Sequence, residues 1–129
     1  MQDERILVVD DHHDNVAIIR DFLLARGYDV AVAHSGEEAL ARFDETGPSL
    51  VLLDVMMPDR NGWEVCEEIK QRSRGANDVR VIMVTALGEW DDKREALRTG
   101  ADDYVTKPLD LIDLGERVER NLAIVRAGR

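Results

Sequence analysis

The chain has very little cysteine, since Cys66 is the one thiol among its 129 residues. It therefore cannot form an internal disulfide bond. It also contains no apolar run near the roughly 20 residues that a membrane-spanning helix needs. Residues 1–5 lack the basic-then-apolar pattern of a secretion signal. Nothing here indicates an oxidising compartment or a membrane, and we expect a cytoplasmic location.

The chain also lacks an excess of basic residues, because its net charge is −10 at pH 7. Nucleic-acid phosphates bind basic surfaces, so this charge argues against direct contact with DNA or RNA. Pro-, Gly- or Ser-rich linkers, internal repeats and low-complexity segments are absent as well. With 44% hydrophobic and 34% charged residues, the composition is typical of one globular domain, which we expect to span residues 1–129.

Five short apolar blocks alternate with longer amphipathic segments along the chain. Most of these blocks are continuous aliphatic runs, which are typical of strands buried on both faces. The predicted strands are residues 6–9, 30–33, 50–53, 81–84 and 104–105. Strands that alternate with helices are joined by crossover connections, and these produce a parallel sheet covered on both faces. The sequence therefore predicts an α/β fold of (βα)5 type.

The segments between the predicted strands have helical periodicity and recognisable ends. The first helix is predicted at about residues 14–26, and the second begins with a capping box formed by Ser35 and Glu38. The third follows residues 61–62 and buries Cys66 as a small core residue, and the fourth lies between residues 89 and 99. The fifth helix starts near residue 110 and has one apolar stripe, formed by Leu111, Leu114, Val118, Leu122 and Val125.

Polar residues of unusual type follow four of the five predicted strands. Asp10 and Asp11 follow the first strand, Asp54 the third, Thr85 the fourth and Lys107 the fifth. Ligand sites in open parallel sheets form at the carboxyl ends of the strands. We therefore expect three carboxylates, a hydroxyl and an ammonium group to converge at one edge of the sheet.

This combination of groups indicates a cation site and a phosphoryl acceptor. A carboxylate in surroundings as apolar as those of Asp54 is costly unless it is paired or bound to a metal. Oxygen ligands favour Mg²⁺, with Mn²⁺ as an alternative. A carboxylate beside a divalent cation and a lysine can accept a phosphoryl group, because the cations stabilise the phosphoryl oxygens. His12 and His13 follow the acid pair and could suggest a transition-metal site, but we interpret them as loop residues apart from the site, since no paired His or Cys lies at ligand spacing.

The chain resembles the receiver domain of response regulators in two-component signalling, of the chemotaxis-regulator type. The matching segments are residues 6–11 (ILVVDD), 36–40 (GEEAL), 53–58 (LDVMMP) with Gly62, 84–86 (VTA) and 100–108 (GADDYVTKP). They span nearly the whole chain. The resemblance implies a flavodoxin-like, doubly wound parallel sheet with strand order 2-1-3-4-5. It also implies a regulatory phosphoacceptor domain that assists its own phosphorylation, rather than an enzyme.

The same resemblance implies a role for each acidic residue of the expected site. Asp54 would be the phosphoacceptor and would also contact the metal. Asp11 and the backbone carbonyl of Met56 would bind Mg²⁺ directly, and Asp10 would assist, often through water. The implied phosphoryl donor is a phosphohistidine of a histidine kinase or of a histidine phosphotransfer protein.

The remaining implied roles concern the switch. Lys107 would pair first with Asp54 and then with the phosphoryl group, and the bond from Lys107 to Pro108 would be cis. Thr85 would donate a hydrogen bond to a phosphoryl oxygen, and Tyr104 would turn inward behind it. Because these two residues lie on neighbouring strands, we expect the signal to reach the surface of the fourth helix, fifth strand and fifth helix. Whether that surface also forms a homodimer stays open.

Two other functions remain open. A Mg²⁺-dependent phosphatase of the haloacid-dehalogenase type also uses an aspartate nucleophile, but that family has an Asp-x-Asp arrangement where Asp10 and Asp11 are adjacent here. The other is a receiver-like binding module that is never phosphorylated, although such chains typically lose an acid or the lysine. Three residues follow the last predicted helix, so no output module is expected within this chain. The downstream partner stays unknown.

Overall fold

A computed structural model describes residues 4–73, 78–85 and 98–128. Its five strands form one parallel sheet in the order β2-β1-β3-β4-β5, which confirms the predicted fold and strand order. Each strand contains its predicted run and extends it by one or two residues. The strands are β1 (Arg5–Val9), β2 (Asp29–Ala33), β3 (Leu50–Asp54), β4 (Arg80–Thr85) and β5 (Asp103–Thr106).

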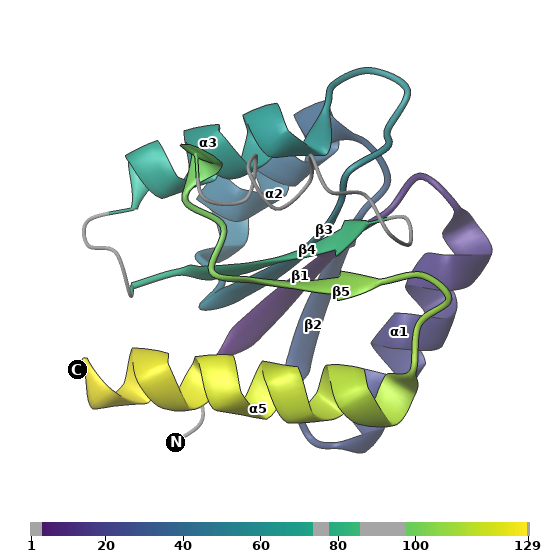
Figure 1. Ribbon diagram of the computed structural model, residues 1–129, viewed down its shortest axis with the longest axis vertical. Coiled ribbons are helices and arrows are strands. Elements are labelled where there is room, and N and C mark those ends of the chain that lie inside the picture. Colours follow the sequence, from purple (N-terminus) through teal and green to yellow (C-terminus); the bar gives the residue numbers. More distant parts are fainter. Residues whose placement is uncertain (1–3, 74–77, 86–97, 129) are drawn as a thin grey trace.

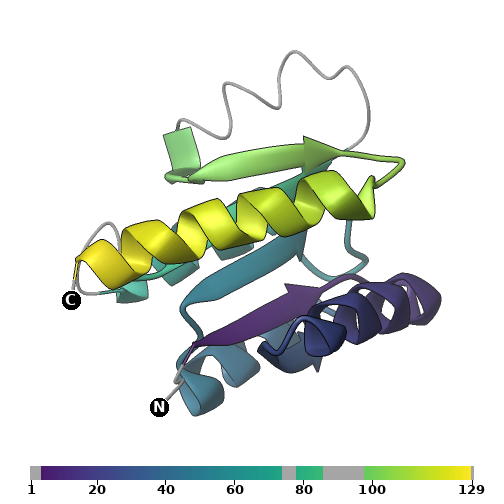
Figure 2. The same ribbon diagram turned by 90° about the horizontal axis from the view of Figure 1, so that it is seen from below.

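Four described helices cover the two faces of the sheet. Helices α2 (Gly36–Thr46) and α3 (Gly62–Arg72) lie on one face, and α1 (His13–Ala25) and α5 (Leu111–Ala127) lie on the other (Figures 1 and 2). The helix predicted between residues 89 and 99 lies almost entirely outside the described residues. Within the described part of the chain, no helix has both the length and the hydropathy needed to span a membrane.

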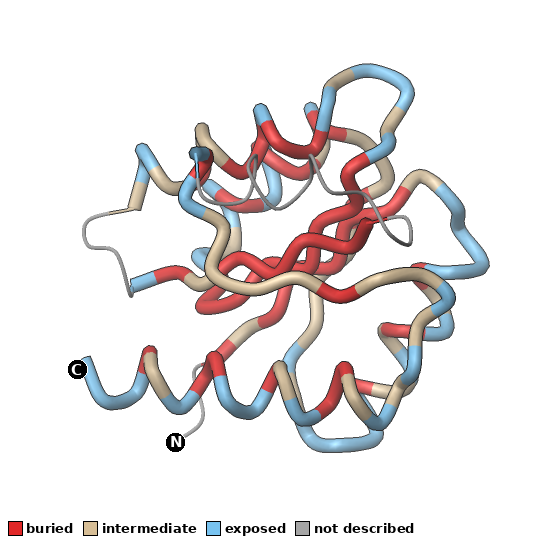
Figure 3. Tube along the Cα trace, in the orientation of Figure 1, coloured by how far each residue is buried: buried red, intermediate tan, exposed pale blue. Residues whose placement is uncertain are grey.

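The apolar strands supply both faces of the sheet with core residues. In β1, Leu7 points into the cluster beneath α2 and α3, whereas Ile6 points into the cluster beneath α1 and α5. Figure 3 shows this buried band running through the sheet. Cys66 is fully buried in the first of these clusters, which confirms its interpretation as a core residue. Burial raises the pKa of the Cys66 thiol to about 11.

Two helix ends differ in detail from the predicted pattern. The Ser35 hydroxyl accepts a hydrogen bond from the backbone N–H of Glu38, as the capping box requires. The Glu38 carboxylate, however, accepts from the backbone N–H of His34 rather than from that of Ser35. In α5, Leu111 is only partly buried, and Asn121 joins the buried stripe instead. Asn121 fits there because it accepts a hydrogen bond from Arg80 and donates one to the backbone carbonyl of Arg117.

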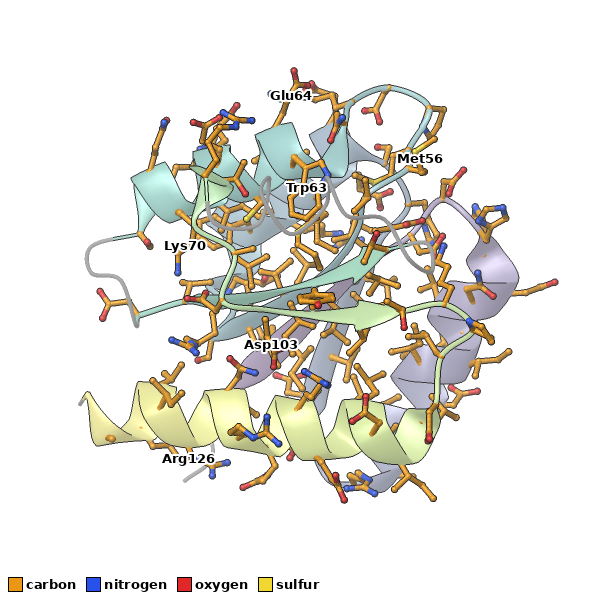
Figure 4. All side chains as sticks on the ribbon, in the orientation of Figure 1. Met56, Trp63, Glu64, Lys70, Asp103 and Arg126 are labelled. Atoms are coloured by element: carbon orange, nitrogen blue, oxygen red, sulfur yellow. The ribbon has the colours of Figure 1, made fainter. Side chains whose placement is uncertain are left out.

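The residue that precedes the first strand is joined to the last helix by a charged pair. Glu4 is 1% exposed, and its carboxylate accepts two hydrogen bonds, of 2.5 and 2.6 Å, from the guanidinium of Arg126. Figure 4 labels Arg126 near the end of α5. The two-pronged geometry suits an arginine and a carboxylate, and it satisfies both oxygens of the buried acid.

The contact between Gly62 and the end of β3 leads to a prediction. A Cβ atom at Gly62 would lie 2.1 Å from the backbone oxygen of Asp54 and 2.8 Å from the Cα atom of Val55. Because backbone atoms cannot rotate away, we expect Gly62→Ala to lower the free energy of unfolding by about 1–3 kcal/mol in urea denaturation.

Gly115→Ala in α5 is the matched control. Its added Cβ would meet the end of the Arg26 side chain at 3.0 Å, and that side chain is flexible. The higher helix propensity of alanine, worth up to about 1 kcal/mol, should offset this contact. Equal stability of the two variants would contradict the close approach described for Gly62.

Candidate phosphoacceptor and metal site

The structure brings the predicted strand-end residues to one edge of the sheet. Asp54 ends β3, and its Oδ2 atom lies 3.3 Å from the Nζ atom of Lys107, which follows β5. Asp10 and Asp11 follow β1, the strand beside β3. One carboxylate oxygen from each of these three acids lies in a group whose members are all within 4.8 Å of one another.

The two most buried acids of this cluster differ in how readily they ionise. Asp54 is 2% exposed, and burial together with the charge of Asp10 raises its pKa to about 6, although Lys107 opposes this shift. Burial acts on Asp10 too, but hydrogen bonds from the backbone and ring of His12 outweigh it and lower the pKa of Asp10. The cluster therefore holds more negative charge than its surroundings neutralise, and a divalent cation would relieve this imbalance.

One oxygen of the cluster has no hydrogen-bond partner. Asp11 Oδ1 is buried, and no donor in the described part of the chain bonds to it. A buried acceptor without a donor costs free energy, whereas bound to a cation it would be satisfied. The carboxylate donors that surround it are those that Mg²⁺ and Mn²⁺ prefer. The residues present therefore fit a divalent cation.

The loop between β3 and α3 is held in place by a backbone contact to Asp54 and by the side chain of Asp59, which the sequence analysis did not single out. The side chain of Met56 is 74% exposed and points away from the domain, while its backbone N–H faces Asp54 Oδ1 at 3.4 Å (Figure 4). Asp59 accepts hydrogen bonds from the backbone N–H groups of Gly36 and Glu37, at 2.9 and 3.0 Å. These bonds lower the pKa of Asp59 and anchor the loop to the start of α2. No local pattern reveals a contact between residues 23 positions apart.

The interpretation of both histidines as residues apart from the site is wrong for His12. Its backbone N–H donates to Asp10 Oδ1 at 2.9 Å, and its ring Nδ1 lies 3.2 Å from an oxygen of Asp10 and 3.2 Å from one of Asp11. His13 lies outside this cluster, and its ring stacks on that of His34 with 3.9 Å between ring centroids. His12 lies at the site because its backbone N–H donates a hydrogen bond to the side chain of Asp10, two positions earlier.

The residues expected to act as a switch lie on β4 and β5. Thr85 is buried at the end of β4, and its backbone oxygen accepts a hydrogen bond from the backbone N–H of Lys107. Tyr104 is partly buried on β5 and packs against the cluster beneath α3. The peptide bond between Lys107 and Pro108 is cis, the configuration that the resemblance implies.

The described part of the expected signalling surface is charged. Arg117 of α5 pairs with Asp103 of β5 at 2.7 Å and with Asp113 at 3.1 Å. Burial opposes the charge of Arg117, but the two acids outweigh it and raise the pKa of Arg117. The pair with Asp103 joins α5 to β5, the edge strand of the sheet, whereas the pair with Asp113 lies within α5. Figure 4 labels Asp103 between β5 and α5.

A five-stranded parallel sheet with an acidic pocket at the carboxyl ends of its strands is the architecture expected of a receiver domain, and comparison with known families gives the same assignment. The family model of the response regulator receiver domain matches residues 6–119. The chain belongs to this family. It is thus the receiver domain of a two-component response regulator, which is a regulatory domain.

Individual relatives agree with this assignment. A probable transcriptional regulator, ycf27, from Porphyra purpurea is 48% identical over 117 residues, which cover 91% of this chain and 46% of the relative. The chain spans about half the length of the curated relatives it matches. A CheY-like receiver domain from Methanospirillum hungatei has a TM-score of 0.90 at 30% identity, with 98% of each chain covered. The receiver domain of DrrB, solved in a BeF3-activated form, has a TM-score of 0.83 at 35% identity and covers 93% of this chain and 97% of that one.

The raised pKa of Asp54 predicts a pH-dependent effect of Asp54→Asn in EDTA. The pKa of this acid rises from an ordinary 3.8 to about 6 on folding, so ionised Asp54 destabilises the folded state. This cost is absent below about pH 4, grows between pH 4 and 6, and is complete above about pH 6. We therefore expect Asp54→Asn to raise the free energy of unfolding at pH 8 by an amount on the order of 2–3 kcal/mol.

The exposed Asp14 in the first turn of α1 provides the control for this measurement. Asp14→Asn should change the free energy of unfolding by less than about 0.5 kcal/mol at either pH. If Asp54→Asn stabilised the domain equally at pH 3.5 and pH 8, ionisation of Asp54 would not be the cause.

Proposed function

We propose that this domain accepts a phosphoryl group on Asp54 from a phosphohistidine of a histidine kinase or phosphotransfer protein. The observation that carries this proposal is the buried Asp54 carboxylate, 3.3 Å from the Lys107 ammonium and clustered with Asp10 and Asp11. A carboxylate oxygen of Asp54 attacks phosphorus, and the P–N bond to the donor histidine breaks. The bonding electrons stay on the histidine nitrogen, and a ring protonated at its other nitrogen leaves as neutral imidazole.

The cation site would serve this transfer. Asp11, Asp54 and the backbone carbonyl of Met56 would hold Mg²⁺, with Asp10 contributing through water, and Mn²⁺ suits the same oxygen donors. When bound, the cation would supply positive charge to the phosphoryl oxygens. Lys107, which follows β5, supplies a second positive charge. Its ammonium group would contact Asp54 before the transfer and the phosphoryl group after it.

Phosphorylation would then shift the domain between two existing conformations rather than create a new fold. The Thr85 hydroxyl would donate to a phosphoryl oxygen, and Tyr104 would turn inward on the neighbouring strand. The affected surface would be the fourth helix with β5 and α5, which is also the candidate surface for a homodimer. Since the relatives are about twice as long as this chain, we place the output in a further domain or a separate protein. The acidic receiver itself would not bind nucleic acid.

A groove beside the site suits the phosphoryl donor. It has a volume of about 320 Å³ and runs from Asp10 and Lys107 to an apolar wall. The wall includes Ile18, which is 55% exposed, together with Leu109 and Leu111. A donor helix that packs its apolar face here would bring its phosphohistidine to Asp54.

Labelling with acetyl phosphate and Mg²⁺ tests the phosphoacceptor. We expect one phosphoryl group per wild-type chain and none on Asp54→Asn. Asp11→Ala should lose metal binding and labelling by more than about tenfold, since even outer partners of a metal site contribute this much. Asp14→Ala, at an exposed position outside the cluster, should label like the wild type.

The alternatives give different outcomes in the same assay. Release of many equivalents of phosphate per chain from a small phosphoester would indicate a phosphatase. Normal binding of Mg²⁺ without any labelling by acetyl phosphate or by a phosphohistidine donor would indicate a binding module.

The donor groove is tested by Ile18→Lys, with transfer from a phosphorylated histidine kinase domain that labels the wild type. We expect transfer to slow by about tenfold or more, equivalent to about 1.4 kcal/mol, because a charge would be buried at the apolar wall. Labelling by acetyl phosphate should be unchanged. Leu24→Lys is the control, since Leu24 is also exposed on α1 but does not line the groove. Equal effects of the two variants would place the donor elsewhere.

A further inference from the structure

The unusual feature of the acidic cluster is an imidazole. Beside Asp10, Asp11 and Asp54, the group of potential ligand atoms includes a ring nitrogen of His12. We propose that His12 is a nitrogen ligand of the cation site and that it shifts the preference of this domain from Mg²⁺ toward transition-metal ions. This inference rests on the cation site proposed above, to which it adds a donor that no acid provides.

The positions of the donor atoms already suit a shared cation. His12 Nδ1 lies 3.2 Å from Asp10 Oδ1 and 3.2 Å from Asp11 Oδ1. In an octahedral site with bonds of about 2.1 Å, adjacent ligand atoms lie about 3.0 Å apart. The 3.2 Å between His12 Nδ1 and Asp11 Oδ1, a proposed direct ligand, is therefore close to the spacing of neighbouring ligands on one metal ion.

The backbone holds the ring at this position. His12 is the N-cap residue of α1, and its own N–H donates to Asp10 Oδ1 at 2.9 Å. The same carboxylate oxygen of Asp10 is also contacted by the ring Nδ1 of His12, so backbone and ring bind one acid. The side chain is 66% exposed, so water can reach the open side of the cluster and complete a coordination shell.

A hydrogen bond alone explains only part of this arrangement. The ring Nδ1 has hydrogen-bond geometry toward Asp10, but Asp11 Oδ1 stays buried without a hydrogen bond although Nδ1 is 3.2 Å away. A cation bound to Nδ1 and Asp11 Oδ1 would satisfy both atoms. It would also give a role to an imidazole at a position where a fourth acid would add only another oxygen donor.

The expected consequence is selectivity. Mg²⁺ binds oxygen donors and gains little from an imidazole, whereas Mn²⁺, Ni²⁺ and Zn²⁺ accept nitrogen, with affinity generally rising from Mn²⁺ to Ni²⁺. A receiver with this ligand should therefore bind Ni²⁺ and Mn²⁺ more tightly, relative to Mg²⁺, than its three carboxylates alone would allow.

The test uses metal binding as its readout. Pulsed electron paramagnetic resonance of the Mn²⁺-loaded domain should show ¹⁴N coupling from a directly bound imidazole in the wild type. The coupling should vanish in His12→Ala and persist in His13→Ala, whose ring lies next in sequence but outside the cluster. By calorimetry, His12→Ala should weaken Ni²⁺ binding by at least about tenfold and change Mg²⁺ binding by less than about threefold.

Two results would overturn the inference: the absence of ¹⁴N coupling in the folded wild type, or an equal loss of Ni²⁺ and Mg²⁺ affinity in His12→Ala. The second result would leave His12 as a hydrogen-bonding residue that orders the acids. Labelling of Asp54 by acetyl phosphate with Mg²⁺ is measured on the same wild-type preparation. If the wild type is phosphorylated on Asp54 but shows no ¹⁴N coupling, the proposed function stands and this inference fails. If the wild type shows ¹⁴N coupling but is never phosphorylated, this inference stands and the proposed function fails.

Discussion

The structure depends on one unfavourable placement, a carboxylate buried at the end of the central strand. Asp54 ends β3, which lies in the middle of the sheet, and it is nearly inaccessible to solvent. Burial and the neighbouring Asp10 both oppose its ionisation, while Lys107 opposes them from the other side. A carboxylate kept in such surroundings is poised for a partner of opposite charge, and this requirement explains why the acids, the lysine and the orphan oxygen of Asp11 gather at the same edge.

The surrounding fold supports this placement through contacts that leave little freedom. Gly62 permits α3 to begin directly against the backbone of Asp54, and Asp59 fixes the intervening loop to the start of α2. On the other side, the backbone N–H of Lys107 donates a hydrogen bond to the backbone oxygen of Thr85, which joins the ends of β4 and β5. In the proposed switch, a small displacement at the pocket would pass along β5 to the ion pair between Asp103 and Arg117 of α5. Closely packed elements respond to such a displacement by shifting between discrete arrangements.

His12 shows how a common framework acquires an individual chemistry. Membership of the receiver family follows from the fold and the matched region. The local backbone nevertheless turns that residue onto Asp10, which places an imidazole among carboxylates. If His12 binds the cation as proposed, the choice of cation would be a property of a single side chain at the pocket mouth, whereas the position of the pocket is a property of the whole sheet.

The sequence by itself determined the fold class, the five strands and the strand ends at which the site lies, because burial on both faces leaves continuous apolar runs and a charge among them is conspicuous. The order of the strands came from the resemblance to a family, since periodicity does not specify which strands are neighbours. Only the tertiary structure decided that His12 joins the acids, that Asp59 caps a helix 23 residues earlier and that Glu4 meets Arg126 across 122 positions. Such partners depend on where the packed elements finally lie, and a one-dimensional pattern records only the burial of each residue and not its neighbour in space.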